Sequence, residues 1–568
     1  MKKDLHISSM TYDESKVTDS FLGPWCMPIE SLDDITTPLF NTNIPPKDLG
    51  KYHEVCHTLA RTLLPYIAKA LNKKHGTTYS LKFWSIMSTT WLTYIIESLH
   101  FYYTAVQHLN ENGMNFNVKV DETFTFRKLS DPPLVWNSAE YIHSMISFIL
   151  ARVEYNNVTL IKQKMISKHE YFMPKTSFVK RFLQKIVWSL LKSEQSKVLI
   201  YGISGINYYH MFKMRLRESN ISFAFITHTE GTTDFLDSDI VKMDYNPNNE
   251  FEKIVVEFIE NNLPISLTNG FSQLLNSAHD YKNKKIVVPS AGFYMDGQLI
   301  EIALAKELND AKLVMFHESG DGMLKVHPDA NNYFDNADLY VTWGWKKYAD
   351  YNNKTIAIDS TIESKYNNCH KEEYPLILYY GKYPDICGYT YIQQVSRDFR
   401  KYYNYRTSFI NEFEQLNMSE LLVLKLHQSK RKCFDEEKLM KSFQLKINNY
   451  NEFKYLTMEN AAIFVTDYNS ASIYSAFVRN VPTIMFFDRK SVPENAELVP
   501  FFDDFEKVGI LYQNPKDAAR KIKDIYHQRD SFWSSDKIQT VREKFLKNYI
   551  NVSDEWEKNL LSVFKNLL

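Results

Sequence analysis

One stretch, residues 461–487, constrains the fold more than any other part of the chain. It reads as a short buried strand at 461–465, a polar turn, a helix from Ser472 with apolar residues at helical spacing, and a second strand after Pro482. The turn and the helix start hold residue types that end strands and cap helices, namely Thr466, Asp467, Asn469, Ser470 and Ser472. This order of elements indicates an α/β domain.

The same turn has two interpretations. It places backbone N–H groups and hydroxyls at a helix N-terminus, an arrangement that suits a phosphate group. The identical residues would also form an ordinary helix cap in any α/β domain, and their spacing alone favours that simpler interpretation. We therefore treat them as candidate phosphate-binding residues.

Composition narrows the class of protein. At 568 residues the chain predicts two to four domains, and 67 Lys and Arg balance 68 Asp and Glu. A formal net charge of −1 gives no bias toward nucleic acid, and no nucleic-acid partner is expected. The five cysteines are scattered and lack metal-site spacing, which predicts no metal or redox cofactor and fits a reducing cytoplasm.

The chain shows neither a secretory signal nor an apolar run long enough to span a bilayer, so we expect a cytoplasmic protein, peripheral to the membrane at most. Residues 1–193 read as a mostly helical region. Within it, Lys175–Lys192 is basic and amphipathic. That stretch could lie on the anionic inner surface of the cytoplasmic membrane, although a solvated helix packed on a sheet is the simpler interpretation.

Two series of strands alternating with helices follow. They predict a first α/β domain at 194–360 and a second at 361–568 that includes C-terminal helices, with a polar hinge at 350–374. Such alternation implies parallel sheets covered on both faces, with ligands beyond the carboxyl ends of the strands.

Chemically useful side chains follow two of these strands. His317, Glu318 and Asp321 come after the strand at 312–316, and His317 is the candidate general base, with the two acids as alternatives or orienting partners. After the strand beginning at Leu421 stand three candidate cationic contacts for a donor phosphate, namely Lys425, His427 and Arg431. A solvated strand end would carry the same residues.

Several motifs together resemble a known group of proteins. Thr466-Asp-Tyr-Asn-Ser-Ala-Ser472, a helix, and then Asn480-Val-Pro-Thr-Ile484 resemble the donor-phosphate segment of CDP-glycerol glycerophosphotransferases and bacterial Kdo transferases. Leu22-Gly-Pro-Trp-Cys26 and the aromatic segment at 83–92 resemble a transferase family of bacterial surface-carbohydrate loci, of the leptospiral lipopolysaccharide-cluster type. Asp338–Trp345 also resembles that family, whereas Glu318 and Ser319 replace two glycines of its usual pattern.

The resemblance implies a GT-B-like fold, with two Rossmann-type parallel-sheet domains and a helical N-terminal region. It implies a transferase of surface-polysaccharide or lipopolysaccharide biosynthesis. Such an enzyme moves a sugar or polyol phosphate from a nucleotide-activated donor, CMP- or CDP-linked donors being favoured, to a glycan or lipid-linked acceptor. Two alternatives stay open: a nucleotide-sugar epimerase on the same scaffold, and a non-catalytic carbohydrate-binding or scaffold protein, which the replaced glycines at 318 and 319 leave possible.

Overall fold

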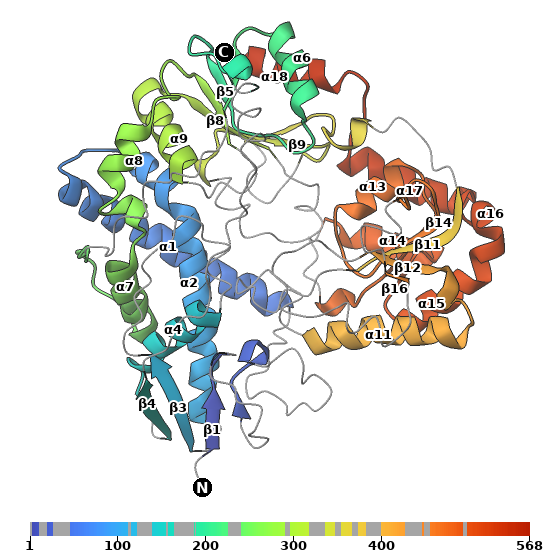
Figure 1. Ribbon diagram of the computed structural model, residues 1–568, viewed down its shortest axis with the longest axis horizontal. Helices are drawn as coiled ribbons and strands as arrows, with labels where there is room; N and C mark the ends of the chain where they lie inside the picture. The colour runs from blue at the N-terminus through green and yellow to red at the C-terminus, as the bar shows by residue number, and fades with distance from the viewer. Residues whose placement is uncertain are drawn as a thin grey trace.

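The structure, a computed structural model, describes most of the chain. The described residues are 3–8, 10, 20–26, 46–111, 115–121, 139–154, 157–163, 187, 189–224, 240–289, 296–316, 335–346, 354–365, 373–381, 399–425, 446–447, 455–491 and 497–568. They form two α/β bodies and a helical region with a small sheet (Figure 1).

Two long helices dominate the N-terminal region. They are α1 (Pro46–His75) and α2 (Leu81–Glu111), which pack along each other. Helix α2 also packs against α9 (Asp296–Asn309) of the first α/β body. Trp25, Trp84 and Trp91 are at most 5% exposed and pack in the core of this region. The indole of Trp84 donates to Oδ1 of Asn72 at 2.9 Å, which ties the start of α2 to the end of α1.

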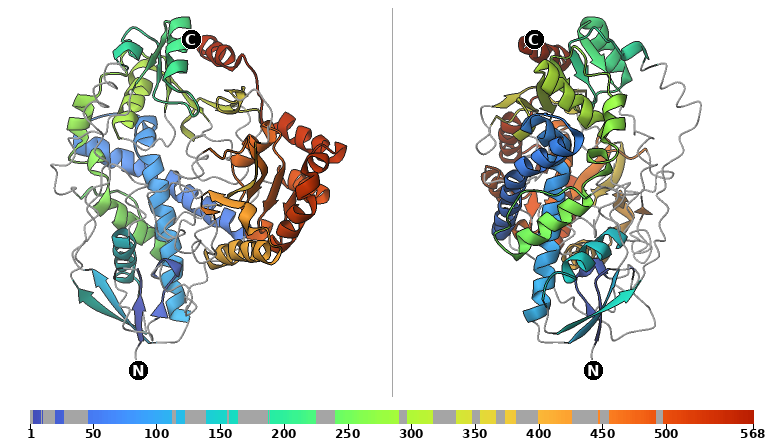
Figure 2. Two further views of the ribbon diagram at one scale, coloured as in Figure 1. Left: turned by 45° about the vertical axis from the view of Figure 1, so that its right-hand side comes forward. Right: turned by 90° about the vertical axis from the view of Figure 1, so that its left-hand side faces the viewer.

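A four-stranded parallel sheet completes this region, in the order β2-β1-β3-β4, and α4 (Ala139–Leu150) packs on β3. Its strands are β1 (Lys3–His6), β2 (Ser20–Phe21), β3 (Phe116–Asp121) and β4 (Val158–Gln163). Figure 2 shows this sheet near the N-terminus, at the opposite end of α2 from the first α/β body. The sequence prediction of a mostly helical region did not include it.

The first α/β body holds six described parallel strands in the order β10-β9-β8-β7-β5-β6. They are β5 (Val198–Ile200), β6 (Ile221–Phe223), β7 (Ile286–Val288), β8 (Lys312–Phe316), β9 (Leu339–Thr342) and β10 (Thr355–Ala357). The helices besides α9 are α6 (Tyr208–Arg217), α7 (Glu250–Asn262) and α8 (Phe271–Ser277). The central strands are continuous apolar runs because helices cover both faces of the sheet.

The second α/β body holds six described parallel strands in the order β13-β12-β11-β14-β15-β16. They are β11 (Tyr374–Tyr380), β12 (Leu422–Lys425), β13 (Lys446–Ile447), β14 (Ala461–Thr466), β15 (Thr483–Phe486) and β16 (Leu511–Tyr512). Numbered along the chain this is 3-2-1-4-5-6, the Rossmann order, and the order reverses between β11 and β14.

Helices surround the second sheet. They are α11 (Phe399–Gln415), α13 (Ser472–Val478), α14 (Val499–Val508), α15 (Pro515–Ile525), α16 (Arg529–Trp533) and α17 (Asp536–Tyr549). Asn514 caps α15 by accepting from the N–H of Lys516, and Pro515 occupies the first turn, where its missing N–H costs nothing. The predicted strand at 461–465 and the helix start at Ser472 correspond to β14 and α13.

The chain crosses between the two α/β bodies twice. After α17 it returns to the first body, where isolated bridges join Gly344 to Ile550 and Asp359 to Asn551. The last helix, α18 (Trp556–Leu567), then packs against α6 and the buried strands of the first sheet. The final helix of the predicted 361–568 segment therefore packs with residues of the 194–360 segment.

The predicted fold class is confirmed. The chain is α/β, with two parallel-sheet domains of Rossmann type in a GT-B-like layout and a helical N-terminal region. Among the helices that the structure describes, none is long and apolar enough to cross a membrane.

Candidate functional site

Three residues lie in one row at the carboxyl edge of the second sheet. Tyr380, the last residue of β11, pairs with Lys425 of β12 on one side and with Thr466 of β14 on the other. The strand order reverses between β11 and β14, and open α/β sheets bind ligands in the crevice that such a reversal opens. The topology alone therefore places a candidate site beside Tyr380 and Thr466.

Lys425 brings a positive charge to this edge. Its ammonium donates to the hydroxyl of Tyr380 at 2.8 Å and lies 4.8 Å from the centre of that ring. Sequence analysis expected Lys425 on a strand end close to the turn after β14. The structure does bring Lys425 to the same edge as Thr466, with β11 between their two strands.

Asp467 fixes the turn after β14 from its buried side. Its Oδ2 accepts from the hydroxyl of Tyr379 at 2.5 Å and from Nε and Nη2 of Arg406, both at 3.2 Å. The side chains of Arg406 and Asp467 are each 2% exposed. Burial and the neighbouring Asp467 carboxylate raise the pKa of the Tyr379 phenol, which stays a donor. These contacts direct Oδ2 of Asp467 into the domain, where it anchors the turn, and the predicted contact of Asp467 with a donor stays a prediction.

Gly381 leaves room for this anchor. A Cβ atom at Gly381 would lie 2.8 Å from Cζ of Arg406, closer than carbon atoms approach in folded proteins. The Arg406 guanidinium therefore packs directly beneath the backbone that follows β11. Only glycine allows the switch point and the Arg406–Asp467 pair to come so close.

The hydroxyls of the turn gather at the start of α13. Ser470 Oγ lies 2.7 Å from Ser472 Oγ and accepts from the Ser472 N–H at 3.3 Å. Thr466 Oγ1 donates to the carbonyl of Tyr468 at 3.3 Å. The N-cap position is occupied by Ala471, without a side-chain cap. The Ser470 hydroxyl, one residue before the N-cap position, accepts from the first N–H group of α13 instead.

The turn is more enclosed than a solvent-facing loop. Thr466 is fully buried and Asn469 and Ser470 are 6% and 8% exposed, whereas Ser472 is half-buried. Ser472 is therefore the most accessible of the predicted phosphate-binding side chains at this turn. A ligand phosphate would meet its hydroxyl and the backbone of the first turn of α13.

Other predicted site residues lie outside the described residues: His317, Glu318, Asp321, His427 and Arg431. The strands that precede them are described, and β8 ends at Phe316 and β12 at Lys425. Trp343 and Trp345, at the end of the segment that resembles the family, are 2% and 3% exposed and belong to the core. No group of three or more His, Cys, Asp or Glu side chains in the described part of the chain is placed to hold a metal ion.

Sequence reasoning missed three residues that shape the site, Tyr379, Tyr380 and Arg406. Arg406 lies in the middle of α11, where a basic residue among tyrosines reads as a solvated helix face. Tyr379-Tyr380-Gly381, at the end of a strand, carried a usable signal, because glycine directly after a parallel strand often marks a close approach.

The family relationship is now clear from the whole chain. The model described as "LIC12162 family transferase" matches residues 7–564, nearly the full length. The chain belongs to this family. Its members are transferases, so the enzyme class expected from the sequence is confirmed. No curated protein matches the chain.

Solved structures give a distant likeness. The wall teichoic acid polymerase TagF, in a variant soaked with CDPG, is 11% identical with a TM-score of 0.32, covering 68% of this chain and 95% of that one. MurG of Acinetobacter baumannii is 9% identical with a TM-score of 0.33, covering 65% and 99%. Os79 of O. sativa, in complex with UDP, is 9% identical with a TM-score of 0.35, covering 65% and 100%.

Proposed function

We propose that this member of the LIC12162 transferase family moves a sugar or polyol phosphate from a nucleotide-activated donor to a glycan or lipid-linked acceptor of surface-polysaccharide or lipopolysaccharide biosynthesis. CMP- and CDP-linked donors are favoured, and the reaction takes place in the cytoplasm. The observation that carries the proposal is the row of Lys425, Tyr380 and Thr466 at the reversal point of a Rossmann-ordered sheet. A transferase family favours group transfer over epimerisation.

In this proposal the donor phosphate lies against the start of α13. The Ser472 hydroxyl and the backbone N–H groups of the first turn donate to its oxygens, and the Lys425 ammonium supplies a positive charge from the same edge. His427 and Arg431 follow Lys425 in the chain, and in this proposal they add hydrogen-bond donors to the phosphate site. Charge that develops on the leaving nucleotide is thereby stabilised by dipoles already in place.

The acceptor hydroxyl needs a base. His317 is the next residue in the chain after β8, and an imidazole side chain is suited to accept a proton at neutral pH. Glu318 and Asp321 orient the imidazole or replace it. His317→Ala should lower turnover roughly 10²–10⁴-fold and leave nucleotide affinity nearly unchanged. A fully active variant would remove His317 from the mechanism.

Calorimetry with CMP, CDP, UDP and cytidine tests the donor site. Lys425→Ala should weaken CDP binding about ten- to a hundredfold, because a charge-assisted hydrogen bond is worth about 1.5–3 kcal/mol, and should leave cytidine binding unchanged. Ser472→Ala should weaken CDP binding less. Lys516→Ala, an exposed lysine at the start of α15, is the matched control.

Two results would overturn this donor site. One is the absence of binding to every nucleotide. The other is equal weakening of CDP and cytidine by Lys425→Ala, because only the former carries the anion that Lys425 is proposed to meet. Transfer is separated from epimerisation by omitting the acceptor: an epimerase still converts its nucleotide sugar, and a transferase does not.

A further inference from the structure

Helix α6 turns apolar side chains toward solvent. Tyr209 is 67% exposed and Leu216 is 87% exposed, the highest value among the large apolar residues that the structure describes as exposed. They are seven residues apart and so share one face of the helix, whereas Met214 is fully buried on the opposite face. A helix that only covers a sheet would present polar residues outward, so this apolar face is a candidate interaction surface.

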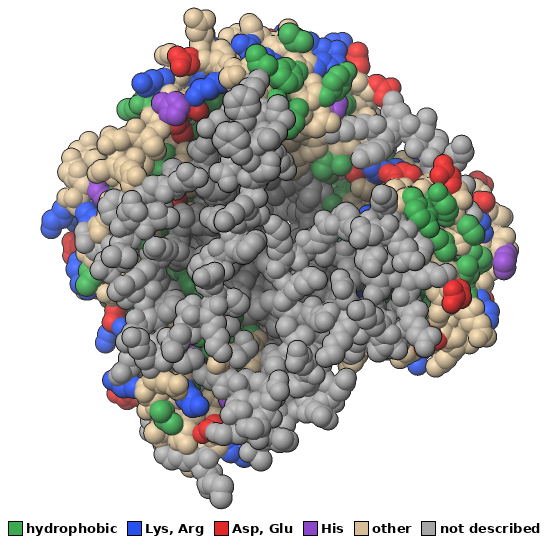
Figure 3. Space-filling model, in the orientation of Figure 1, with side chains coloured by type: hydrophobic (Ala, Val, Ile, Leu, Met, Phe, Trp, Pro, Cys, Tyr) green, Lys and Arg blue, Asp and Glu red, His purple; other side chains and the backbone are tan. Residues whose placement is uncertain are grey.

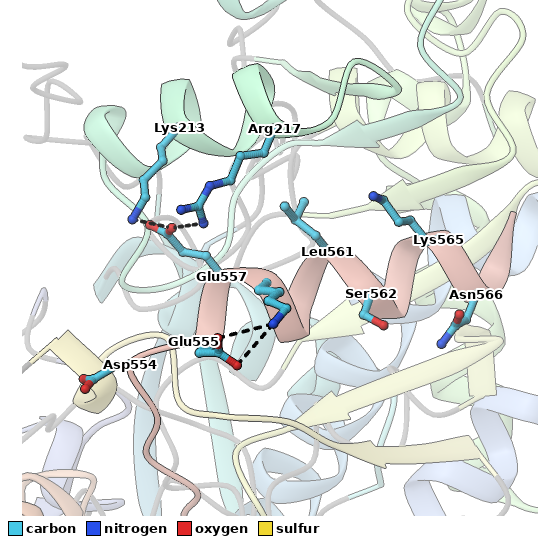
Figure 4. Close-up of a pocket in the computed structure, with 10 residues that line it drawn as sticks. Lys213, Arg217, Asp554, Glu555, Glu557, Leu561, Ser562, Lys565 and Asn566 are labelled. Atoms are coloured by element: carbon cyan, nitrogen blue, oxygen red, sulfur yellow. Dashed lines mark hydrogen bonds and ion pairs between the residues drawn. The ribbon is translucent and has the colours of Figure 1, made fainter.

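Cations flank the exposed apolar face. Helix α6 carries Lys213, Arg215 and Arg217 and has no acidic residue within Tyr208–Arg217. Lys213 and Arg217 reach Glu557 of α18 at 2.6 Å and 3.0 Å, and both lie on the same side of α6 (Figure 4). One buried carboxylate thus faces two permanent cations. Arg215, on the other side of the helix, donates to the carbonyl of Ser219 at 2.6 Å and keeps its full charge.

A groove runs beside this face, between α6 and α18. It encloses about 580 Å³, and its lining includes four cations, Lys213, Arg217, Lys558 and Lys565, and three carboxylates, Asp554, Glu555 and Glu557. Leu561 and Ser562 of α18 also line it (Figure 4). Burial alone would raise the pKa of Glu557, but hydrogen bonds from Lys213 and His210 lower it below its usual range. The groove is therefore polar, with charges of both signs, and lies next to an apolar helix face.

The position of α6 suits contact with an extended surface. The helix lies at an outer end of the molecule beside α18 (Figure 1), where Figure 3 shows hydrophobic and basic side chains next to each other. The segment before β5 joins the same region: Leu191 and Met214 share one buried cluster, and the neighbouring Leu190 is 62% exposed. That segment is the described end of the basic stretch Lys175–Lys192.

The occupant follows from the chemistry of the face. Exposed tyrosine and leucine bordered by lysine and arginine is the pattern of a helix that lies in a bilayer interface, where apolar side chains enter the acyl boundary and cations meet anionic headgroups. Because Glu557 pairs with Lys213 and Arg217, Arg215 is the cation of α6 that remains to meet an anionic headgroup.

We propose that α6 docks the protein onto the surface of an anionic phospholipid bilayer. Leu216 and Tyr209 insert into the interface, and Lys213, Arg215 and Arg217 lie at the level of the lipid phosphates. The docking surface stands independently of the transfer reaction. Its further consequence, that a lipid-linked acceptor reaches the protein from this side, rests on the proposed function.

Vesicle flotation with the full-length protein tests the docking surface. The protein should float with vesicles of phosphatidylcholine mixed with phosphatidylglycerol and much less with phosphatidylcholine alone, and added salt should reduce binding. Leu216→Glu should lower the partition coefficient at least about tenfold, because one inserted leucine is lost and a like charge faces the lipid. Arg215→Glu should abolish the preference for anionic vesicles.

The matched control is Leu308→Glu, on α9, because Leu308 is a similarly exposed helical leucine at 58%. It should float like the wild type. Thermal melting verifies folding of each variant, and Tyr209→Glu is a second variant of the same face. Nucleotide affinity, measured on the same samples, should not change, so failure of the docking surface and failure of the donor site are told apart.

Two outcomes would overturn the proposal. The first is wild-type protein that stays unbound with anionic vesicles, or Leu216→Glu that binds them as well as the wild type. The second is a concentration-dependent dimer, seen by light scattering, that Leu216→Glu dissociates. In that case the face is covered by a second copy of the chain.

Discussion

Arg479 and Glu363 form a buried ion pair that ties α13 to the segment crossing between the two α/β domains. Nη1 of Arg479 donates to Oε2 of Glu363, and the Ser475 hydroxyl donates to Oε1 at 2.5 Å. The two charged side chains are 5% and 2% exposed. Arg479 also reaches Glu459 at 2.6 Å, before β14. The helix that begins at the candidate donor turn is thus held at its other end by the crossing segment.

Arg479→Ala should destabilise the protein strongly. It leaves the Glu363 carboxylate buried without its cation, and breaking a buried pair from one side costs about 3–5 kcal/mol. Urea unfolding should show a loss in the free energy of unfolding of at least about 3 kcal/mol. Lys69→Ala is the control, because Lys69 and Asp244 are 74% and 88% exposed at 3.3 Å, and such surface pairs contribute about 0–1 kcal/mol. Equal losses for both variants would mean that the buried pair contributes no more to the free energy of unfolding than an exposed pair does.

The close approach at Gly381 gives a second prediction. Gly381→Ala adds a methyl group against the guanidinium of Arg406, which cannot move away because Asp467 holds it in the core. We expect a loss of about 1–3 kcal/mol, typical of an overpacked core, together with weaker CDP binding because the turn after β14 shifts. Arg406→Lys should weaken CDP binding in the same direction, since lysine lacks the planar fork that bonds Asp467.

The sheets were predictable because their information is local. The stretch 461–465 is a continuous apolar run, the turn after it has capping residues, and apolar residues recur from Ser472 at helical spacing. The strands at 312–316 and 374–380 give the same kind of local signal, a short run of mostly apolar residues. Periodicity and turn chemistry decide such elements with no knowledge of the partner strands.

The anchors of the site were not predictable because they join residues distant in the chain. Asp467 reads as a capping residue, yet its partner Arg406 lies 61 positions earlier. Glu363 stands in a stretch that reads as a polar hinge, yet it is 2% exposed and bonded 116 positions away. The strand β1, with only four residues of which Lys3 and Asp4 are polar, exists through pairing with β2 and β3 and has no periodic signal of its own.

The return of the chain to the first domain gives a third prediction. Gly344 has a φ of +148°, and a Cβ atom there would lie 2.9 Å from the backbone nitrogens of Ile550 and Asn551. Gly344→Ala should therefore push this crossing apart and loosen α18. Hydrogen exchange should become faster across residues 550–567. Gly50→Ala is the control, because nothing lies within 4 Å of its Cβ position on α1. Unchanged exchange in Gly344→Ala would show that α18 docks without this crossing.

The half-buried imidazole of His100 gives a pH-dependent prediction. On α2 it packs against Tyr52 and Phe251, with ring centres 5.3 and 5.0 Å apart, and burial lowers the pKa of His100 from about 6.5 to about 4. The native protein therefore keeps His100 neutral, whereas the unfolded chain takes up a proton below about pH 6.5. The free energy of unfolding therefore falls as the pH drops from about 6.5 toward 4. Below the folded-state pKa the loss that His100 causes is complete, because both states then bind the proton.

The size of this effect follows from the shift. Between pH 7 and pH 5, His100 should remove about 2 kcal/mol from the free energy of unfolding. Other groups also titrate in acid, so the test is a difference: urea unfolding of His100→Phe, compared with the wild type, should lack this part of the pH dependence. His108→Phe, an exposed position on the same helix, should follow the wild-type profile. A His100→Phe profile parallel to that of the wild type would mean that His100 takes up its proton without unfolding the contact between α2 and α7.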